Sequence, residues 1–388
     1  MNLGIGICNY NRREDVCRAV ASVVSQQVHF GALIVVDNAS TDGSVEALME
    51  MAIPRLEVVV SSTNGGSAGG FSKASGLLFD RGCDLILLMD SDCWLDADSL
   101  ALWIASMLEH PDVGVMGARI MHAHSPDTIQ ECGSYLDWEK AEFRLNRRDL
   151  IWKGLGTIPD FEEVDYVPAC ALIARREVFE KIGHFDPAWF IYFDDIEWCW
   201  KARTEGFGVR VNNSIAAFHK GGGKVKSSHF STYYYWRNRM RFFGRYTDRA
   251  RYSEMKAGFV ETTCRAIATS RILGLEKSAR IISRAIEDGL RGAYGEAEFD
   301  MGELDLDEPS LFQVDLRLGK EQQVLLDHVF DPISDSIDLE RPGCVMDRFG
   351  KCVSLETYLL LRPHYEELVT KLRLELGLQI NNSLMHIV

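Results

Sequence analysis

Basic residues are scarce in this sequence. Lys and Arg number 42 against 57 Asp and Glu, which gives a formal net charge of −15 at pH 7 over 388 residues. A general nucleic-acid-binding protein needs clustered basic residues to neutralise phosphates, so the composition argues against that class of partner. A negatively charged substrate would need local positive charge at its own site.

Long apolar runs and paired cysteines are missing as well. No stretch reaches membrane-spanning length, and the N-terminus begins with the strand-like LGIGIC rather than with a basic segment and a long apolar run. The ten cysteines include no Cys-x-x-Cys pair, and Cys170 and Cys199 sit singly in apolar surroundings. This pattern indicates buried thiols in a reducing compartment rather than a zinc site or a disulfide framework. We therefore expect a cytoplasmic protein that does not span a membrane.

What the sequence does have is an alternation of apolar runs and helical patterns, in a chain long enough for two or three domains. The apolar runs predict strands at residues 3–8, 32–36, 56–60, 85–89, 113–121, 164–174, 207–211 and 214–218. The segments between the early runs repeat apolar residues at helical spacing, whereas residues 122–163 show no clean period. This alternation predicts an α/β fold with a doubly wound, mostly parallel sheet, whose ligand lies at the carboxyl ends of the strands.

Polar residues follow the first four predicted strands. Arg12, Asp37 and Asn64 come after the first three, and the fourth ends abruptly in the sequence DSD. Alternation along an extended chain sends Asp90 and Asp92 to one side, where two carboxylates suit a hard divalent cation that carries substrate phosphates. A bare Asp-x-Asp also occurs in solvated turns and helix caps, so the pair alone leaves both interpretations open.

Glycines cluster in the sequence NGGSAGG at residues 64–70. The cluster lacks the Gly-x-Gly-x-x-Gly order, so we reject a dinucleotide-binding interpretation. Two alternatives stay open, because the glycines either form a tight loop or present backbone amides to a phosphate or a sugar.

The second half of the chain adds two acidic residues and a histidine. The aromatic run FIYF delivers Asp194 and Asp195 to a predicted helix start, where Asp194 can act as a cap. An acidic helix N-terminus stabilised by the helix dipole is the structural alternative. His219 closes a predicted strand next to a run of three glycines, a position suited to gating a ligand, although a lone histidine is more often structural.

From residue 228 onward the pattern is helical. Residues 233–243 mix aromatics with arginines, which indicates either ordinary helix packing or a surface for anionic lipid. Residues 295–310 are acidic without a basic residue and predict a linker. The predicted organisation is therefore an α/β domain at 1–227, a helical extension at 228–294, the linker at 295–310 and a helical segment at 311–388.

Six motifs in order along residues 1–245 resemble one enzyme family. They read YNRREDVCRAV, VVDNASTDGS, NGGSAGGFSKA, LLMDSDC, FIYFDDIEW and FHKGG. With them the chain resembles inverting family-2 glycosyltransferases of the GT-A fold, most closely the galactofuranosyltransferase branch. It differs from some members of that branch by having Ala169-Cys170 where they carry a tryptophan pair.

The resemblance implies a role for each residue that matches a motif. It places Arg12 at the diphosphate, Asp37 at uracil, Asn64 in the donor pocket and Asp90 near the ribose. It implies that Asp92 and His219, with Asp90, hold Mn or Mg, and that Asp195 is the catalytic base. Candidates for the acceptor side are Glu131, Trp189 and Asp194.

The implied reaction is transfer of galactofuranose from UDP-galactofuranose to a glycan acceptor, expected to be lipid-linked, in bacterial polysaccharide or cell-surface glycan synthesis. The alternative donors are dTDP-rhamnose and other UDP-hexoses. For the basic aromatic stretch the hypothesis is peripheral attachment to the inner face of the cytoplasmic membrane, where a lipid-linked acceptor would lie, and an oligomer stays open. A non-catalytic carbohydrate- or nucleotide-binding protein is the alternative from a different class.

Overall fold

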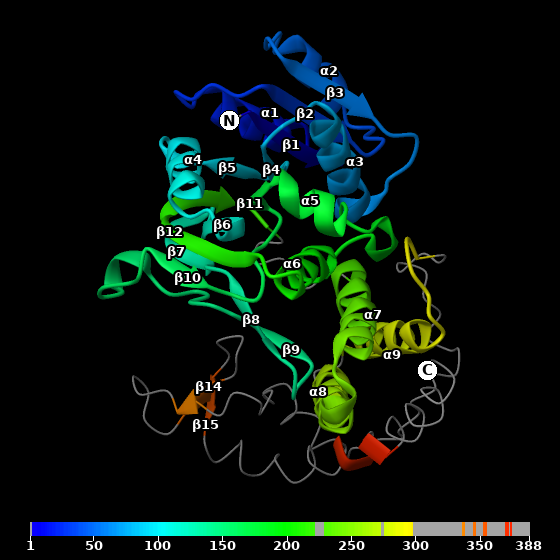
Figure 1. Ribbon diagram of the computed structural model, residues 1–388. Coiled ribbons are helices and arrows are strands. Elements are labelled where there is room, and N and C mark those ends of the chain that lie inside the picture. Colours follow the sequence, from blue (N-terminus) through cyan, green and yellow to red (C-terminus); the bar gives the residue numbers. More distant parts are fainter. Residues whose placement is uncertain are drawn as a thin grey trace. The chain divides into compact units, whose positions relative to one another are not determined.

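The computed structural model describes residues 2–221, 229–272 and 275–297, and the short stretches 336–337, 344–346, 352–354, 369–371 and 373–374. The chain divides into two compact units. The sheet unit comprises Met1–Leu136, Phe143–Val225 and Tyr294–Glu296, and the helical unit comprises Asp137–Glu142, Lys226–Ala293 and Ala297–Val388. The elements of both units appear in Figure 1.

Ten strands of the described residues form one sheet. They are β1 (Leu3–Asn9), β2 (Ala32–Asp37), β3 (Leu56–Val60), β4 (Leu85–Asp90), β5 (Cys93–Leu95), β6 (Val113–His122), β7 (Ser125–Glu131), β10 (Phe161–Glu163), β11 (Ala171–Arg175) and β12 (Gly208–His219). The main order is β10-β12-β6-β11-β4-β1-β2-β3, with β5 paired to β12 and β7 paired to β6. Strands β8 (Ser134–Asp137) and β9 (Glu142–Leu145) pair separately.

Strand direction decides which residues meet at the edge of the sheet. Strands β1, β2, β3 and β4 are mutually parallel, and β6 is parallel to β12. Because β11 is antiparallel to both β4 and β6, strands β6 and β12 run in the same direction as β4. The predicted doubly wound, mostly parallel sheet is confirmed, and its principal strands all end at one edge.

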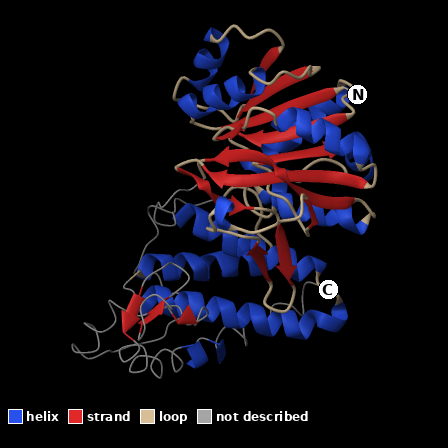
Figure 2. Ribbon diagram, turned by 90° about the vertical axis from the view of Figure 1, so that its left-hand side faces the viewer, coloured by secondary structure: helices blue, strands red, loops and turns tan. Residues whose placement is uncertain are grey.

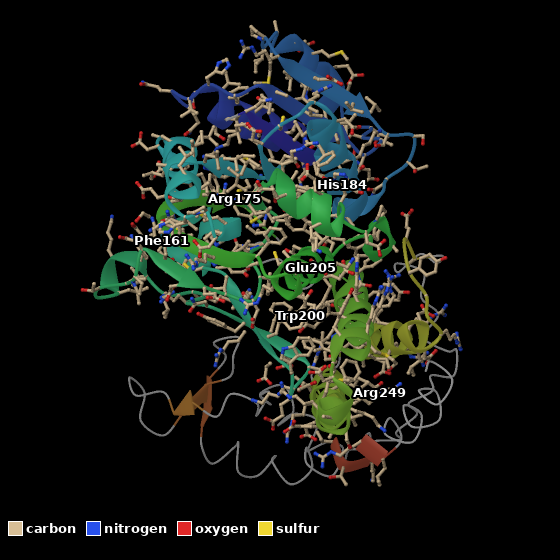
Figure 3. The ribbon with its side chains drawn as sticks, in the orientation of Figure 1. Phe161, Arg175, His184, Trp200, Glu205 and Arg249 are labelled. Carbon is tan, nitrogen blue, oxygen red and sulfur yellow. The ribbon has the colours of Figure 1, made fainter. Side chains whose placement is uncertain are left out.

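Helices cover both faces of this sheet, as Figure 2 shows. They are α1 (Arg13–Val24), α2 (Ser44–Glu50), α3 (Gly66–Asp80), α4 (Ser99–Glu109), α5 (Arg176–Ile182) and α6 (Asp194–Thr204). Side chains fill the space between these helices and the strands (Figure 3).

The sequence LGIGIC explains how β1 accommodates two layers. Leu3, Ile5 and Ile7 point into the core that α1 and α4 share with one face of the sheet. On the opposite face, a Cβ added to Gly4 or Gly6 would lie 2.7 Å or 2.9 Å from a side chain of α3. The two glycines therefore allow α3 to pack close against the strand.

Several predicted strands differ from the observed ones. Residues 207–211 and 214–218 belong to the single strand β12, whose register against β6 shifts between Asn212 and Ala216. The predicted strand 164–174 is reduced to β11, and residues 122–163 hold β7 to β10 instead of irregular chain. Bulges and very short strands break the alternation that a sequence pattern depends on, which is why these predictions were wrong.

The helical unit contains α7 (His229–Tyr246), α8 (Tyr252–Ile272) and α9 (Glu276–Leu290), which confirms a helical region after the sheet. Two arginines of the aromatic stretch, Arg237 and Arg239, are buried inside this unit. Arg239 donates from Nε to the Ala141 carbonyl at 2.6 Å and from Nη2 to the Lys140 carbonyl at 2.9 Å. For these two arginines the structure favours helix packing over a lipid surface.

Beyond residue 297 little of the chain is described. Strands β13 (Ser336–Ile337), β14 (Cys344–Met346) and β15 (Cys352–Ser354) form a small antiparallel sheet. The rest of the predicted linker and most of the predicted helical segment 311–388 lie outside the described residues. Among the helices that are described, none is long and apolar enough to cross a membrane.

Most of the cysteines whose side chains are described are buried. Seven are buried, including Cys170 and Cys199, and Cys17 is half-buried. The expectation of buried thiols is therefore confirmed for this part of the chain.

Candidate active site

Asp90, Asp92 and His219 come together at the carboxyl edge of the sheet. Asp90 is the last residue of β4, and His219 is the last residue of β12. Asp92 reaches them because the next residue, Cys93, begins the short strand β5 and pairs with His219 itself. The sequence analysis did not predict β5, although it is the element that places Asp92 beside the histidine.

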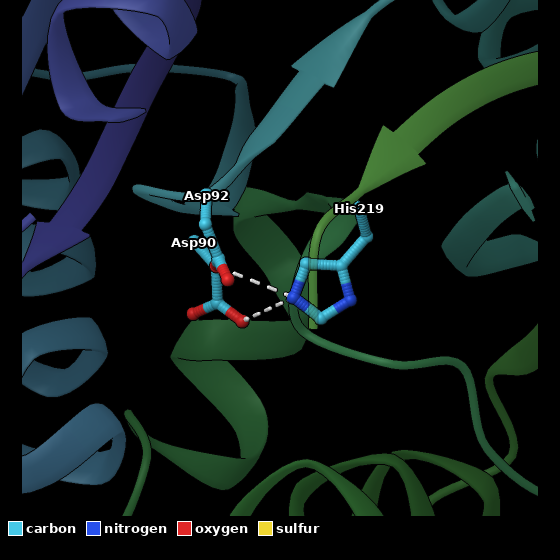
Figure 4. Close-up of side chains that lie close together, drawn as sticks. All are labelled: Asp90, Asp92 and His219. Atoms are coloured by element: carbon cyan, nitrogen blue, oxygen red, sulfur yellow. Dashed lines mark ion pairs between the residues drawn. The ribbon is translucent and has the colours of Figure 1, made fainter. Parts of the chain in front are cut away.

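These side chains form a compact cluster, here called the Asp–Asp–His cluster (Figure 4). One ligand atom from each residue lies within 4.8 Å of the other two. His219 Nε2 is 3.3 Å from Asp92 Oδ1 and 3.8 Å from Asp90 Oδ2. Two carboxylates and one imidazole are a donor set that can hold a divalent cation, and the carboxylates fit Mg2+ and Mn2+ best.

Neighbouring charges shift the pKa values of the two carboxyl groups in opposite directions. Partial burial and the neighbouring Asp92 raise the pKa of Asp90 to about 6, against the opposing effects of His219 and Arg12. Burial also acts to raise the pKa of Asp92, but the hydrogen bond and charge of His219 and the charge of Arg12 outweigh it and lower that pKa. Arg12 Nη1 lies 2.7 Å from Asp92 Oδ2. The predicted diphosphate residue thus borders the predicted metal ligands.

Asp37 is the last residue of β2, at the same edge of the sheet, and is fully buried. Asn9 Nδ2 donates to its Oδ2 at 2.8 Å, and the Ser40 backbone N–H donates to its Oδ1 at 2.8 Å. Each carboxylate oxygen keeps one further lone pair, which is what a base-edge N–H would need. Sequence reasoning missed Asn9, whose polar side chain at the end of a buried strand is the signal that could have revealed it.

The glycine cluster forms the start of helix α3. Asn64 Oδ1 accepts a hydrogen bond from the Gly66 N–H at 2.9 Å, so the predicted donor-pocket residue also shapes the helix start. Gly66 has a φ of +67°, and a Cβ there would overlap the carbonyl oxygen of Phe190. For Gly66 the tight-packing alternative is therefore correct, since only glycine fits this contact.

The aromatic run before Asp194 is a turn rather than a strand. Phe190, Tyr192 and Phe193 have φ values of +64°, +63° and +67°, which side-chain-bearing residues adopt rarely and at a cost. Phe193 is the N-cap of α6 and Asp194 is already its first residue, so the expectation that Asp194 caps the helix was wrong. Asp194 instead accepts a hydrogen bond from Ser67 Oγ at 3.0 Å.

Asp195 is held by two backbone amides. The Ile196 N–H donates to its Oδ1 at 2.8 Å, and the Ala169 N–H donates to its Oδ2 at 3.2 Å. The next residue after Ala169, Cys170, accepts from the Asp90 N–H at 3.1 Å. Ala169 and Cys170 thus connect Asp195 to the Asp–Asp–His cluster.

Asp194 and Asp195 differ in how readily they ionise. Burial and the neighbouring Asp195 raise the pKa of Asp194 well above its usual value. Burial raises the pKa of Asp195 as well, but its bonds from Ala169 and Ile196 act in the opposite direction. Because adjacent carboxyl groups resist ionising together, the pair holds a proton more readily than an isolated aspartate does.

The predicted acceptor-side residues lie in different surroundings. Glu131 accepts from Ser134 Oγ at 2.6 Å, and burial raises its pKa to about 7, with Asp195 adding to the effect. Tyr166, which sequence reasoning missed, interacts with the same carboxylate. Trp189 is fully buried in a 3-10 turn, Pro187–Trp189.

Comparison with known proteins finds similarity over the sheet unit. Residues 5–183 match the family model described as Glycosyl transferase family 2. The chain is 21% identical over 226 residues to the low-salt glycan biosynthesis hexosyltransferase Agl10 of Haloferax volcanii, an alignment that covers 56% of this chain and 67% of the relative. It is 27% identical over 201 residues to an uncharacterized glycosyltransferase of Nostoc sp., covering 50% of this chain and 57% of the relative.

The fold also occurs among solved structures. The crystal structure of GalNAc-T7 with UDP, GalNAc and Mn2+ aligns with a TM-score of 0.52 at 14% identity, covering 68% of this chain and 50% of that chain. At that identity the likeness concerns the fold alone, and it agrees with the predicted GT-A type. The family-model match over residues 5–183 and the two relatives support a glycosyltransferase, whereas none of these comparisons singles out the galactofuranosyltransferase branch.

Proposed function

We propose that this protein transfers a hexose from a nucleotide sugar to a glycan acceptor, with a divalent metal held by the Asp–Asp–His cluster. The observation that carries the proposal is the convergence of Asp90, Asp92 and His219 within 4.8 Å, at the sheet edge to which Asp195 is tied through Ala169. The family 2 match over residues 5–183 supports the reaction class.

The proposed reaction inverts the configuration at the anomeric carbon. Asp195 takes the proton from an acceptor hydroxyl, whose oxygen forms a bond to the anomeric carbon as the bond to the nucleoside diphosphate breaks on the opposite side. Two amide donors keep Asp195 in one orientation during this step. A bound Mn2+ or Mg2+ would stabilise the negative charge that develops on the leaving diphosphate. Arg12 can add positive charge at the same place.

For the donor we propose UDP-galactofuranose first, then dTDP-rhamnose and UDP-pyranoses. Asp37 can accept from the imide N–H of uracil, but thymine presents the same imide, so this contact does not separate the two bases. The name of the Haloferax relative supports a hexose and a glycan acceptor.

A panel of nucleotide sugars tests the donor, with nucleotide release measured in the presence of Mn2+ or Mg2+. Turnover of UDP-galactofuranose is the expected result. Turnover of dTDP-rhamnose alone would contradict the galactofuranosyl proposal while leaving the base and metal assignments intact. Binding without any turnover of the panel would instead favour the non-catalytic alternative.

We also propose peripheral contact with a membrane that carries a lipid-linked acceptor. Because Arg237 and Arg239 are buried, the proposed contact uses the exposed Arg245, Arg249 and Arg251 of the helical unit. Flotation with vesicles of anionic lipid at low salt tests it, with Arg249→Glu and Arg251→Glu together expected to weaken binding. An intact protein that stays unbound would contradict it.

A further inference from the structure

The ring of His219 has one nitrogen that faces the cluster and one that does not. Nε2 is the atom near Asp90 and Asp92, whereas Nδ1 is buried and has no hydrogen-bond partner. A metal-bound histidine normally donates its other ring N–H to an acceptor, which fixes the tautomer and the ring orientation. A buried N–H without an acceptor is also costly in itself.

Gln130 supplies the complementary atom. Its Oε1 is likewise buried without a hydrogen-bond partner. The residue sits in β7, where Ile120 of β6 pairs with Glu131 but Met121 pairs with Ile129, so Gln130 is the extra residue of a bulge. Bulges beside functional sites commonly redirect a side chain that regular pleating would have placed elsewhere.

Gly221 shows that the two side chains approach the same point. A Cβ on this glycine would lie 2.7 Å from Gln130 Nε2 and 3.5 Å from both Nδ1 and Cε1 of His219. The amide and the imidazole therefore pack against the same side of the glycine. Oxygen and nitrogen of a glutamine amide differ little in shape, and turning the amide by half a rotation exchanges their places.

We propose that Gln130 is a positioning residue for His219, whose Nδ1–H donates to the amide oxygen of Gln130 so that Nε2 is directed at the metal. The inference rests on the proposed metal site and names a residue outside the metal's own ligands. The rival partner is the thiol of Cys170, which also interacts with His219. A thiol is only a weak acceptor, so the amide oxygen is the better partner for a buried N–H.

Mn2+ titration in the presence of UDP, followed by the electron paramagnetic resonance of the free ion, measures this role. Gln130→Met keeps the length of the side chain but removes the acceptor, and we expect it to weaken Mn2+ binding by about 10- to 100-fold. Gln130→Glu restores an acceptor and should bind Mn2+ nearly as well as the wild type. Cys170→Ala is the matched control and should leave the affinity unchanged. Unaltered thermal unfolding shows that each variant is folded.

A second measurement needs no metal. Histidine labelled with 15N, with the His219→Gln variant for assignment, should show a slowly exchanging Nδ1–H in the wild type that disappears in Gln130→Met.

The outcomes separate this inference from the proposed function. Equal Mn2+ affinity in wild type and Gln130→Met, or a loss confined to Cys170→Ala, would overturn the role of Gln130 and leave the glycosyltransferase intact. If the wild type binds no Mn2+, the proposed metal site is wrong, and only the Nδ1–H signal then tests the role of Gln130. An Nδ1–H signal that persists in Gln130→Met would then overturn the inference, and its loss would support the hydrogen bond.

Discussion

Two neighbouring carboxyl groups at the start of α6 are expected to behave in opposite ways. Asp194 accepts from a serine hydroxyl, whereas Asp195 accepts from two backbone amides, which favour its charged form. Asp195→Asn should therefore retain donor binding while turnover falls by roughly 10²-fold or more. Asp194→Asn resembles the protonated acid and should keep most of the activity.

Steady-state turnover and UDP binding of the two variants test this assignment. Equal loss of binding and turnover in Asp195→Asn would indicate that Asp195 only stabilises the helix start. A larger loss of turnover in Asp194→Asn than in Asp195→Asn would reverse the two roles.

The raised pKa of Glu131 predicts how the stability of the protein depends on pH. Its pKa is about 7 in the folded protein against an ordinary value of 4.5, because it is buried. The folded state thus holds the proton more tightly than the unfolded state, so this contribution to stability is complete below pH 4.5 and is lost as the pH rises through 7. Glu131→Gln should become more stable relative to the wild type as the pH rises, by about 1–3 kcal/mol at pH 8.

Denaturant unfolding of both proteins at pH 5 and pH 8 measures the effect, with the exposed Glu50→Gln as control. A difference between Glu131→Gln and the wild type that stays constant over this range would show that Glu131 is not buried as described.

Single residues were predictable from the sequence where they end a strand. Asp92 and His219 follow apolar runs, and the pattern alone indicated a ligand-binding edge. Asn9 and Gln130 were not found. Asn9 ends a buried strand, but only its hydrogen bond to Asp37 shows what the side chain does. Gln130 lies in a bulge inside β7, and its proposed role became visible only from its place beside His219.

Among the elements, α3 and the aromatic turn depend on one close contact. Gly66→Ala would place a methyl group against the Phe190 carbonyl oxygen at a positive φ, so we expect a loss of about 2 kcal/mol or more and weaker donor binding. Gly69→Ala lies in the same helix with open space around the added Cβ, and should be neutral or stabilising by about 0.5–1 kcal/mol.

Unfolding midpoints of the two glycine variants provide the comparison. Similar stability for Gly66→Ala and Gly69→Ala would contradict the contact with Phe190.

The length of an element decides whether its sequence pattern could predict it. β1 and β4 are long buried runs, and their prediction was correct within a residue or two. β5 has three residues, and β7 contains a bulge, so neither shows a period long enough to recognise. The aromatic run at 190–193 favours a strand by composition, yet backbone contacts with Gly66 and Ala68 hold it as a turn.

For the molecule as a whole, the direction of the strands links the fold to the chemistry. The chain alternates strands and helices so that β1, β2, β4 and β12 all end at one edge, and each of them contributes a polar side chain there. Because the net charge of the chain is −15, the proposed mechanism relies on Arg12 and the proposed cation to offset the charge of a nucleoside diphosphate. Loss of Arg12 or of the cation should therefore weaken donor binding more than it destabilises the fold.

The most direct test of this account is nucleotide release from a UDP-sugar by metal-stripped protein that is then titrated with Mn2+ or Mg2+. We predict that the wild type is inactive with a chelator and regains turnover with either metal, whereas Asp92→Ala regains none at the same concentrations. Normal sugar transfer by Asp92→Ala with the chelator present would contradict the metal-dependent mechanism.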